Sequence, residues 1–251
     1  MKFYKIEQGS TGWYEARMGR PTASNFHKIV TPKGEPSKQA VKYLYRLLAE
    51  RLLHETMDDE IGFVQWVARG KEQEPNAVAM FNFTNEVELE PGGFCTSDDG
   101  RIGASPDRTL RHMTEGVEIK CPAPWTQLEY LFEGPGDDYK PQVQGQILVT
   151  GFRAVHFYSW HGQMPPLHKV TTPDRNYQGV LRSALNSFCD ALDVMEGRAR
   201  AIGAYAVMRR VQRPSDAAYA DEADRPPLVI INPEGGPIED AVRPPNQDYD
   251  G

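Results

Sequence analysis

Two acidic residues and a lysine stand close together in the middle of the chain, in a spacing that suits metal-assisted hydrolysis. Asp107 follows a proline, and Glu118 comes after ten intervening residues, with Ile119 separating it from Lys120. In a β-strand, side chains two residues apart point to the same face, so Glu118 and Lys120 project together if this stretch is a strand. A preceding strand over residues 101–107 would form a hairpin with it and bring Asp107 beside them.

This cluster offers the hard oxygen ligands that Mg²⁺ or Mn²⁺ prefer, from the carboxylates of Asp107 and Glu118 and the backbone carbonyl of Ile119. Phosphodiester hydrolysis needs such a cation because the phosphate repels hydroxide, the leaving oxygen is poor, and the attacking water must lose a proton near neutral pH. Lys120 would orient and help activate that water and would stabilise charge on the phosphorane. On spacing alone, a hairpin with surface acids and a solvated lysine stays an open alternative.

The elements expected around the cluster alternate between helix and strand. The clearest helix covers residues 37–55, and a second run over 64–83 contains Pro75, which removes a backbone donor and predicts a kink or a restart. Further helices are expected at 13–19, after 22, and at 125–132, 139–149 and 174–196, with strands at 87–89, 101–104, 117–120, 154–160 and 167–171. This order predicts an α/β (α+β) fold with a central mixed β-sheet flanked by helices.

Composition excludes several protein classes. The chain has 251 residues, of which 39% are hydrophobic and 25% charged, as in an ordinary globular protein. No run approaches a membrane span, the first residues lack the apolar core of a signal peptide, and three scattered cysteines suit a reducing cytoplasm. The phosphate-binding loop of ATPases is absent from the sequence, so no ATP hydrolysis is expected. We therefore expect a cytoplasmic protein with no membrane contact.

Charge divides the chain into two parts. The net charge is −7, and residues 213–251 carry nine acidic residues against three arginines, together with seven of the 20 prolines. Residues 1–212 are therefore nearly neutral, and such a body still binds nucleic acid if its basic groups are clustered. We predict a folded domain over 1–212, followed by an extended or partly disordered acidic tail over 213–251.

An ordered series of motifs within residues 6–160 resembles a known family. Pro-Asp, ten residues and then Glu-x-Lys is the signature of the PD-(D/E)xK nuclease superfamily. Within it, the chain is similar to the viral alkaline exonucleases typified by phage lambda exonuclease, also called the YqaJ-type recombinase family. The shared blocks are Gln8-Gly9-Ser10, Trp13, Arg17-x-Gly19, Thr22-Ala23-Ser24, Gly70-Lys71-x-x-Glu74, Ser105-Pro106-Asp107, Glu118-Ile119-Lys120-Cys121-Pro122 and Tyr139-x-x-Gln142-Val143-Gln144.

The resemblance implies a restriction-endonuclease-like core and assigns roles within the cluster. Asp107 and Glu118 become the primary metal ligands and Lys120 the catalytic lysine. Glu74 is implied as an additional carboxylate at the metal centre, although a helix-surface glutamate is its plain alternative. Gln142 matches the glutamine that completes the site, with two Mg²⁺ ions expected there. Gln144 lies on a different helical face, and its function is left open.

The resemblance also implies a pocket for the terminal 5′-phosphate of DNA. Arginine binds phosphate with charge-assisted, bidentate hydrogen bonds, and a helix start offers further donors near Ser24. Alternatively, Arg17 pairs with Glu7 or Glu15, and Ser24 only caps a helix. The residues at the matching positions are Arg17, Ser24, Ser105 and Gln142.

From the family, we expect a Mg²⁺-dependent, processive 5′-to-3′ exonuclease on double-stranded DNA ends. A ring-shaped homotrimer and a single-strand annealing protein as partner are implied with it, in a phage or bacterial setting. Val67 matches, weakly, the place of an apolar wedge that separates the duplex end. Independently, Lys38, Lys42 and Arg46 recur every four residues and predict a basic stripe toward DNA, or else only a solvated helix face.

Two alternatives remain open at this point. One keeps the nuclease centre in an endonuclease or in an exonuclease of other polarity. The other is a catalytically inactive DNA-end-binding recombination scaffold, against which the intact Asp107, Glu118 and Lys120 count.

Overall fold

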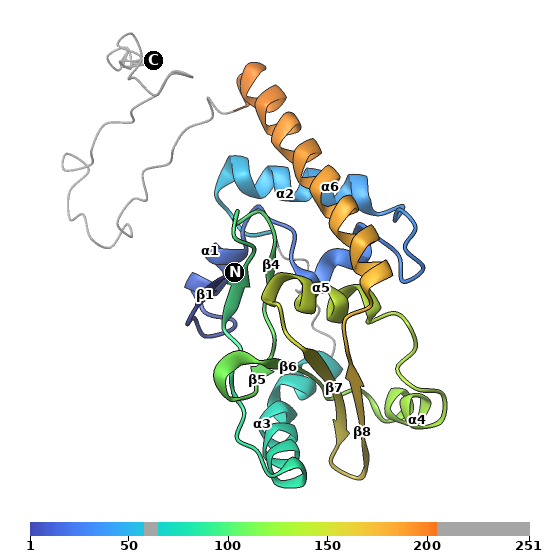
Figure 1. Ribbon diagram of the computed structural model, residues 1–251. Coiled ribbons are helices and arrows are strands. Elements are labelled where there is room, and N and C mark those ends of the chain that lie inside the picture. The colour runs from blue at the N-terminus through green and yellow to red at the C-terminus, as the bar shows by residue number, and fades with distance from the viewer. Residues whose placement is uncertain (58–64, 205–251) are drawn as a thin grey trace, which may run out of the picture. The chain divides into compact units, whose positions relative to one another are not determined.

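The structure is a computed structural model that describes residues 1–57 and 65–204 (Figure 1). Within the chain, residues 1–193 form one compact unit. A second unit covers 194–251, of which 194–204 are described as the end of the last helix and a turn. The expected domain boundary at 212 and the expected acidic tail lie outside the described residues. In the part of the chain that the structure describes, no helix is both long enough and apolar enough to cross a membrane.

A five-stranded mixed sheet forms the centre of the first unit, in the order β2-β5-β6-β7-β8. Its central pair, β6 and β7, is parallel, and the other neighbours are antiparallel. A smaller antiparallel sheet has the order β1-β3-β4. The strands are β1 (Lys2–Tyr4), β2 (Glu90–Pro91), β3 (Phe94–Thr96), β4 (Gly103–Ala104), β5 (Arg108–Thr109), β6 (Glu115–Lys120), β7 (Ala154–His161) and β8 (Met164–Thr171).

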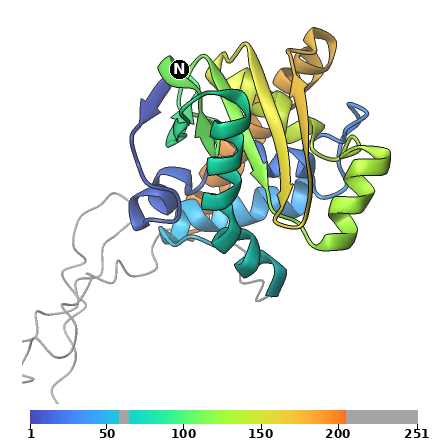
Figure 2. The ribbon, with the colours of Figure 1, turned by 90° about the horizontal axis from the view of Figure 1, so that it is seen from below.

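Helices lie on both faces of this sheet, so the predicted fold class is confirmed (Figure 2). Two of them, α4 and α5, lie in the crossover that the parallel pair β6–β7 requires. The α-helices are α1 (Thr11–Arg17), α2 (Ala40–Leu53), α3 (Gln65–Asn85), α4 (Pro124–Glu133), α5 (Lys140–Thr150) and α6 (Arg175–Ala201), and the 3₁₀ helices are η1 (Ala23–Lys28) and η2 (Arg111–Met113).

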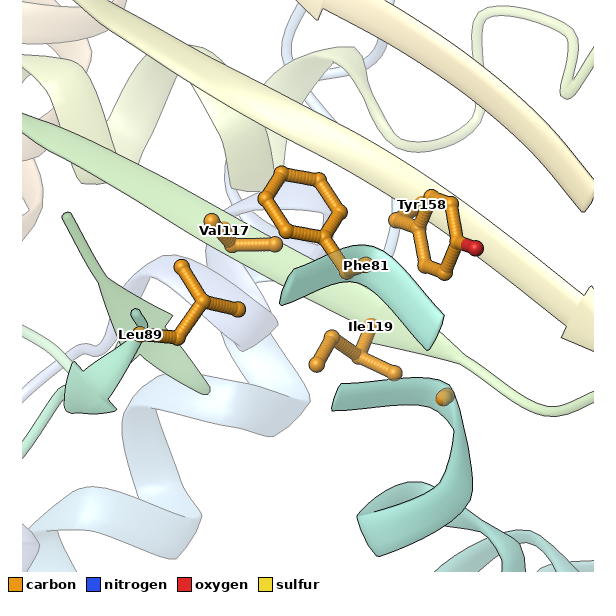
Figure 3. Packing of buried hydrophobic residues seen from close by; sticks show 6 residues of the cluster. Phe81, Leu89, Val117, Ile119 and Tyr158 are labelled. Atoms are coloured by element: carbon orange, nitrogen blue, oxygen red, sulfur yellow. The ribbon is translucent and has the colours of Figure 1, made fainter. Parts of the chain in front are cut away.

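Alternation along β6 separates the hydrophobic core from the polar face. Val117 and Ile119 are buried against Phe81 of α3 and Tyr158 of β7 (Figure 3). Because successive side chains of a strand point to opposite faces, Glu118 points away from α3 and toward α5. The core under α3 thus fixes which side chains of β6 face the other helix.

Three expectations about strands and helices are wrong in detail. Helix α3 runs through Pro75 as one helix, so of the expected kink or restart the restart is wrong. Residues 87–89 are not a strand, since β2 begins at Glu90. Residues 101–107 do not pair with β6: Gly103 and Ala104 belong to the smaller sheet, and the hairpin partner of β6 is the next segment, β5. A strand of only two residues leaves no periodicity to read.

The N-terminal end of α2 also differs from the expectation. The helix begins at Ala40 and not at Ser37. Val41, which has core spacing, is 67% exposed, while Tyr43 is buried and its ring stacks on that of Phe188 from α6 at 5.7 Å between centroids. The packing of α6 against α2 decides which face of α2 is buried, and the residue spacing within α2 does not predict that packing.

Candidate active site

Asp107 lies next to Glu118 and Lys120, as the spacing predicts. It directly precedes β5, and its Oδ2 accepts a hydrogen bond from the backbone N–H of Ile119 at 2.7 Å. The register Arg108↔Val117 between β5 and β6 produces this approach. On β6, the Nζ of Lys120 lies 2.5 Å from Oε1 of Glu118. Asp107, Glu118 and Lys120 form what we call the acidic cluster.

Glu118 is the most buried member of the acidic cluster, with a side chain only 2% exposed. Besides Lys120, two glutamines of α5 donate to it: Gln142 Nε2 to Oε1 and Gln146 Nε2 to Oε2, each at 2.6 Å. A buried carboxylate is costly unless its lone pairs are satisfied, and these donors satisfy them. The predicted neighbour Gln142 is therefore found beside Glu118, and Gln146 joins it.

The two carboxylates of the acidic cluster affect each other. Burial, together with the negative charge of Glu118, raises the pKa of Asp107 to about 8. Burial acts to lower the pKa of Lys120, but the negative charges of Glu118 and Asp107 outweigh it and raise this pKa instead. Lys120 is therefore a protonated cation with donors to offer, and it is not a free amine base.

Glu74, which the resemblance implies as a carboxylate of the metal centre, is paired with an arginine in this structure. Its Oε1 lies 2.9 Å from Nη2 of Arg108, which also donates through Nη1 to the backbone carbonyl of Asp107 at 2.7 Å. Among residues 1–57 and 65–204, no three His, Cys, Asp or Glu side chains are grouped so that they could hold a metal ion. The carboxylates of Asp107 and Glu118 are thus the acidic oxygen ligands that the structure brings together beside Lys120, and the role of the Ile119 carbonyl stays a prediction.

The residues expected to bind phosphate form a chain of contacts through Trp13. The indole Nε1 of Trp13 donates to Oγ of Ser105 at 2.8 Å, and the guanidinium of Arg17 lies 4.1 Å from the centroid of the indole ring. Arg17 Nη2 in turn donates to Oγ of Ser24 at 3.3 Å. Three of the four residues predicted for the phosphate pocket therefore meet around one aromatic side chain.

Two segments outside the loop that carries Ser105 and Asp107 contact its backbone at Pro106. Gln8 donates through Nε2 to the backbone carbonyl of Pro106 at 3.2 Å. On the other side, Gly92 comes so near that a Cβ atom there would collide with the carbonyl of Pro106. Glycine at this position allows the close backbone approach that sets the place of Asp107.

One open cavity of about 1610 Å³ contains the acidic cluster and the phosphate-pocket residues together. The ring of Tyr139 also lines it, with its centroid 5.5 Å from Nζ of Lys120, within the range of a cation–π contact. The predicted site residues in its wall are Arg17, Ser24, Glu74, Ser105, Asp107, Glu118, Ile119, Lys120 and Gln142.

Among the described residues predicted to contact DNA more remotely, Lys38, Lys42 and Arg46 do not line this cavity. Lys38 precedes α2, Lys42 is exposed on it, and Arg46 is ion-paired with Glu50 at 3.5 Å, so the three are not one uniform exposed stripe. The side chain of Val67 lies outside the described residues. Their role in DNA binding stays a prediction.

Gln144, whose function the sequence left open, has structural partners. It is 2% exposed, donates to the carbonyl of Thr172 at 2.9 Å, and accepts from the N–H of Asp174 at 3.0 Å. These bonds attach α5 to the segment that follows β8. Gln144 is thus turned away from the acidic cluster.

Two residues at the site were not identified from the sequence. Gln146 lies four residues after Gln142, so helical periodicity could have placed both on the same face of α5. Arg108 follows Asp107 directly, but its partner Glu74 lies on α3, far from it in the sequence. Only the tertiary structure brings that pair together.

Two known structures with a similar fold are exonucleases. An alkaline exonuclease (LHK-Exo) from Laribacter hongkongensis superposes with a TM-score of 0.69 at 24% identity, over 78% of this chain and 98% of that one. A phage related exonuclease from Haemophilus somnus 129PT gives a TM-score of 0.57 at 12% identity, over 71% and 96% of the two chains. At these identities, the likeness shows the fold.

A comparison with curated proteins gave no match. Residues 12–153, more than half of the chain, match the family described as the YqaJ-like viral recombinase domain. That segment contains every residue of the acidic cluster and of the expected phosphate pocket. The chain therefore belongs to the YqaJ-like viral recombinase domain family.

Proposed function

We propose that the protein is a Mg²⁺-dependent exonuclease that degrades one strand of duplex DNA from its 5′ end and leaves 3′ single-stranded overhangs for recombination. The observation that carries the proposal is the shared cavity of the acidic cluster and the Arg17–Ser24–Ser105 group. A hydrolytic centre next to a phosphate-binding group suits a substrate that ends in a phosphate and is cut beside it.

The acidic cluster fits a divalent cation by its charge as well as by its ligands. Burial, together with the nearby negative charge of Glu118, raises the pKa of Asp107, and the two carboxylates repel each other when both are ionised. A divalent cation would relieve that repulsion, with the carbonyl of Ile119 as a further hard ligand. A second ion would draw on Glu74, which is paired with Arg108 in this structure.

The protein side chains would divide the work of hydrolysis. A bound cation supplies a Lewis acid that offsets phosphate charge. Lys120, which stays protonated, orients the attacking water and stabilises negative charge on the phosphorane. Gln142 and Gln146 hold the carboxylate of Glu118 in one orientation through both of its oxygens.

A 5′-terminal phosphate would bind to Arg17, Ser24 and Ser105, which line the same cavity as the acidic cluster. Arg17 offers a planar pair of donors, and the hydroxyl of Ser105, which accepts a bond from Trp13, can donate its own proton to a phosphate oxygen. Ser105 lies two residues before Asp107, so this phosphate would be bound close to the acidic cluster. That arrangement favours cutting near the 5′ end.

Assembly and partnership extend the proposal through the family resemblance. A ring-shaped homotrimer around the duplex would make the enzyme processive despite its negative net charge, because dissociation would require the ring to open. A single-strand annealing protein would then coat the exposed 3′ strand.

Digestion of a linear duplex labelled at one 5′ end or one 3′ end, with Mg²⁺ or with EDTA, tests the proposal. We expect early release of the 5′ label as mononucleotide, with Mg²⁺ only. Release of the 3′ label first would indicate the opposite polarity, and internal fragments would indicate an endonuclease. Binding of duplex ends without cleavage under any divalent cation would support the inactive scaffold instead.

A further inference from the structure

Helix α1 ends in a turn that lies between the two phosphate-pocket residues Arg17 and Ser24. Gly19 lies in this turn, is buried, and has a φ of +67°, a left-handed conformation that favours glycine. Two consecutive residues of α2 hold its backbone: Oε2 of Glu50 accepts from the N–H at 2.8 Å, and Nε of Arg51 donates to the carbonyl at 2.6 Å. We call Gly19, Glu50 and Arg51 the turn clamp.

The turn clamp is itself anchored at both sides. Glu50 is 5% exposed, and its second oxygen accepts from the N–H of Met57 at 3.2 Å. Arg51 reaches Asp193 of α6 through Nη1, at 2.8 Å. A Cβ atom at Gly19 would collide with the side chain of Arg51. The turn therefore has one well-defined place relative to α2.

Neither Glu50 nor Arg51 lines the large cavity, so neither would touch DNA bound there. Arg17, however, lies only two residues before Gly19, and its carbonyl accepts from the N–H of Arg20 within the same turn, at 3.3 Å. A shift of the turn would move the guanidinium of Arg17 relative to the Ser24 hydroxyl, to which it donates at 3.3 Å.

We infer that the turn clamp positions Arg17 against Ser24 and thereby sets the preference of the enzyme for 5′-phosphorylated over 5′-hydroxyl DNA ends. Glu50 and Arg51 are positioning residues in this inference, which rests on the proposed function. Its chemical basis is geometric. The two parallel hydrogen bonds from an arginine guanidinium to a phosphate weaken when the guanidinium is displaced from its position.

The variant Arg51→Ala tests the inference, and because the side chain of Arg51 is only 21% exposed, the unfolding temperature of the variant is measured beside its activity. The readout is the ratio of kcat/KM on 5′-phosphorylated duplex to that on 5′-hydroxyl duplex. We expect the ratio to fall about tenfold, through a higher KM for phosphorylated ends, while cleavage of hydroxyl ends is unchanged. Arg153→Ala, which also removes an arginine from an ion pair, is the matched control and should keep the ratio.

A double-mutant cycle asks whether Arg51 acts through Arg17. In an Arg17→Ala background the preference for phosphate is already lost, so adding Arg51→Ala should change the ratio no further. Glu50→Gln keeps an oxygen that can accept from Gly19 and should retain most of the preference. Gly19→Ala, which displaces Arg51, should lower it as Arg51→Ala does.

The outcomes separate the inference from the proposed function. If Arg51→Ala and Gly19→Ala leave the ratio unchanged, or reduce cleavage of both substrates equally, the turn clamp has no role in end selection and the inference is wrong. The same holds if Arg51→Ala lowers the ratio further in the Arg17→Ala background. If the wild-type protein cleaves both ends equally well, the phosphate pocket itself is wrong, and the inference fails with it.

Discussion

Strand β6 carries a glutamate at its first residue and another near its last, and the two have different surroundings. Glu115, at the start, accepts from Nη2 of Arg153 at 3.2 Å and lies 2.7 Å from Nε2 of His156. His156 in turn contacts His168 through Nδ1 at 2.8 Å. Glu118, near the end, is deeply buried and receives three donors. Both carboxylates are well hydrogen-bonded, so hydrogen bonding alone does not distinguish the two ends.

Charge balance does distinguish them. The single carboxylate of Glu115 meets a guanidinium, and that pair is close to neutral. At the other end, Glu118 and Asp107 share one ammonium group, from Lys120, and burial together with the negative charge of Glu118 raises the pKa of Asp107. An arrangement that is left with surplus charge is costly for stability, and such sites are where a cation or a reaction uses that charge.

The largest expected effect follows from removing the only ammonium group of the acidic cluster. Lys120→Ala should lower the cleavage rate roughly 10³-fold, because a preorganised cation at the developing charge is lost. Binding of duplex ends should persist, since Arg17 and Ser24 are untouched. Single-turnover digestion together with a gel-shift assay measures both quantities.

Glu115→Gln is the control for this experiment at the opposite end of β6. It alters a glutamate of the same strand but leaves the acidic cluster intact, so the cleavage rate should stay within about twofold. Full activity of Lys120→Ala would remove Lys120 from the mechanism. Equal losses of cleavage rate in the two variants would mean that the acidic cluster contributes no more to catalysis than the opposite end of β6.

The second prediction concerns stability and its dependence on pH. The pKa of Asp107 in the folded protein, about 8, lies above the ordinary value of 3.8 for an aspartate. Between these values the folded state holds the proton more tightly than the unfolded state, so without metal, stability falls as pH rises from about 4 to about 8. Asp107→Asn, which cannot ionise, should therefore be more stable than the wild type at pH 8.5 in EDTA, by about 2 kcal/mol.

Thermal or urea unfolding in EDTA at pH 5 and at pH 8.5 measures this difference. The gain should be small at pH 5, where Asp107 is still protonated in the folded protein. Added Mg²⁺ should stabilise the wild type and not Asp107→Asn. If the Asn variant is less stable than the wild type at both pH values, ionisation of Asp107 does not destabilise the folded protein.

The acidic cluster was predictable from the sequence for a simple physical reason. Side chains in a strand alternate with a period of two, so Glu118 and Lys120 must share a face once their segment is a strand. Buried Val117 and Ile119 then decide which face that is. The nearness of Asp107 was also predicted, although the strand that pairs with β6 was expected at residues 101–107 and is β5, which Asp107 directly precedes.

What the sequence could not supply were contacts between distant segments. The family resemblance implies Glu74 as a carboxylate of the metal centre, but in this structure Glu74 is paired with Arg108, which comes from another element. The buried face of α2 likewise depends on Phe188, so Val41 is exposed although its spacing suits the core side of a helix. Local periodicity specifies a helix, whereas the side of it that is covered depends on packing.

The last prediction compares two buried glutamines on α5 that differ only in their partners. Gln146→Met keeps the volume of the side chain but removes the hydrogen bond that Gln146 donates to Oε2 of Glu118. We expect kcat to fall about tenfold and the Mg²⁺ requirement to rise, because a net hydrogen bond to a charged group is worth about 1.5–3 kcal/mol.

Gln144→Met is the matched control, since it removes bonds to Thr172 and Asp174 and none to the acidic cluster. It should lower the unfolding temperature while the cleavage rate at 25 °C and the Mg²⁺ requirement remain those of the wild type. The pair separates catalysis from folding, because both variants lose buried hydrogen bonds on one helix. If the two variants lose activity alike, the second oxygen of Glu118 does not need Gln146, and the hydrogen bonds at that end of β6 serve stability alone, as those around Glu115 do.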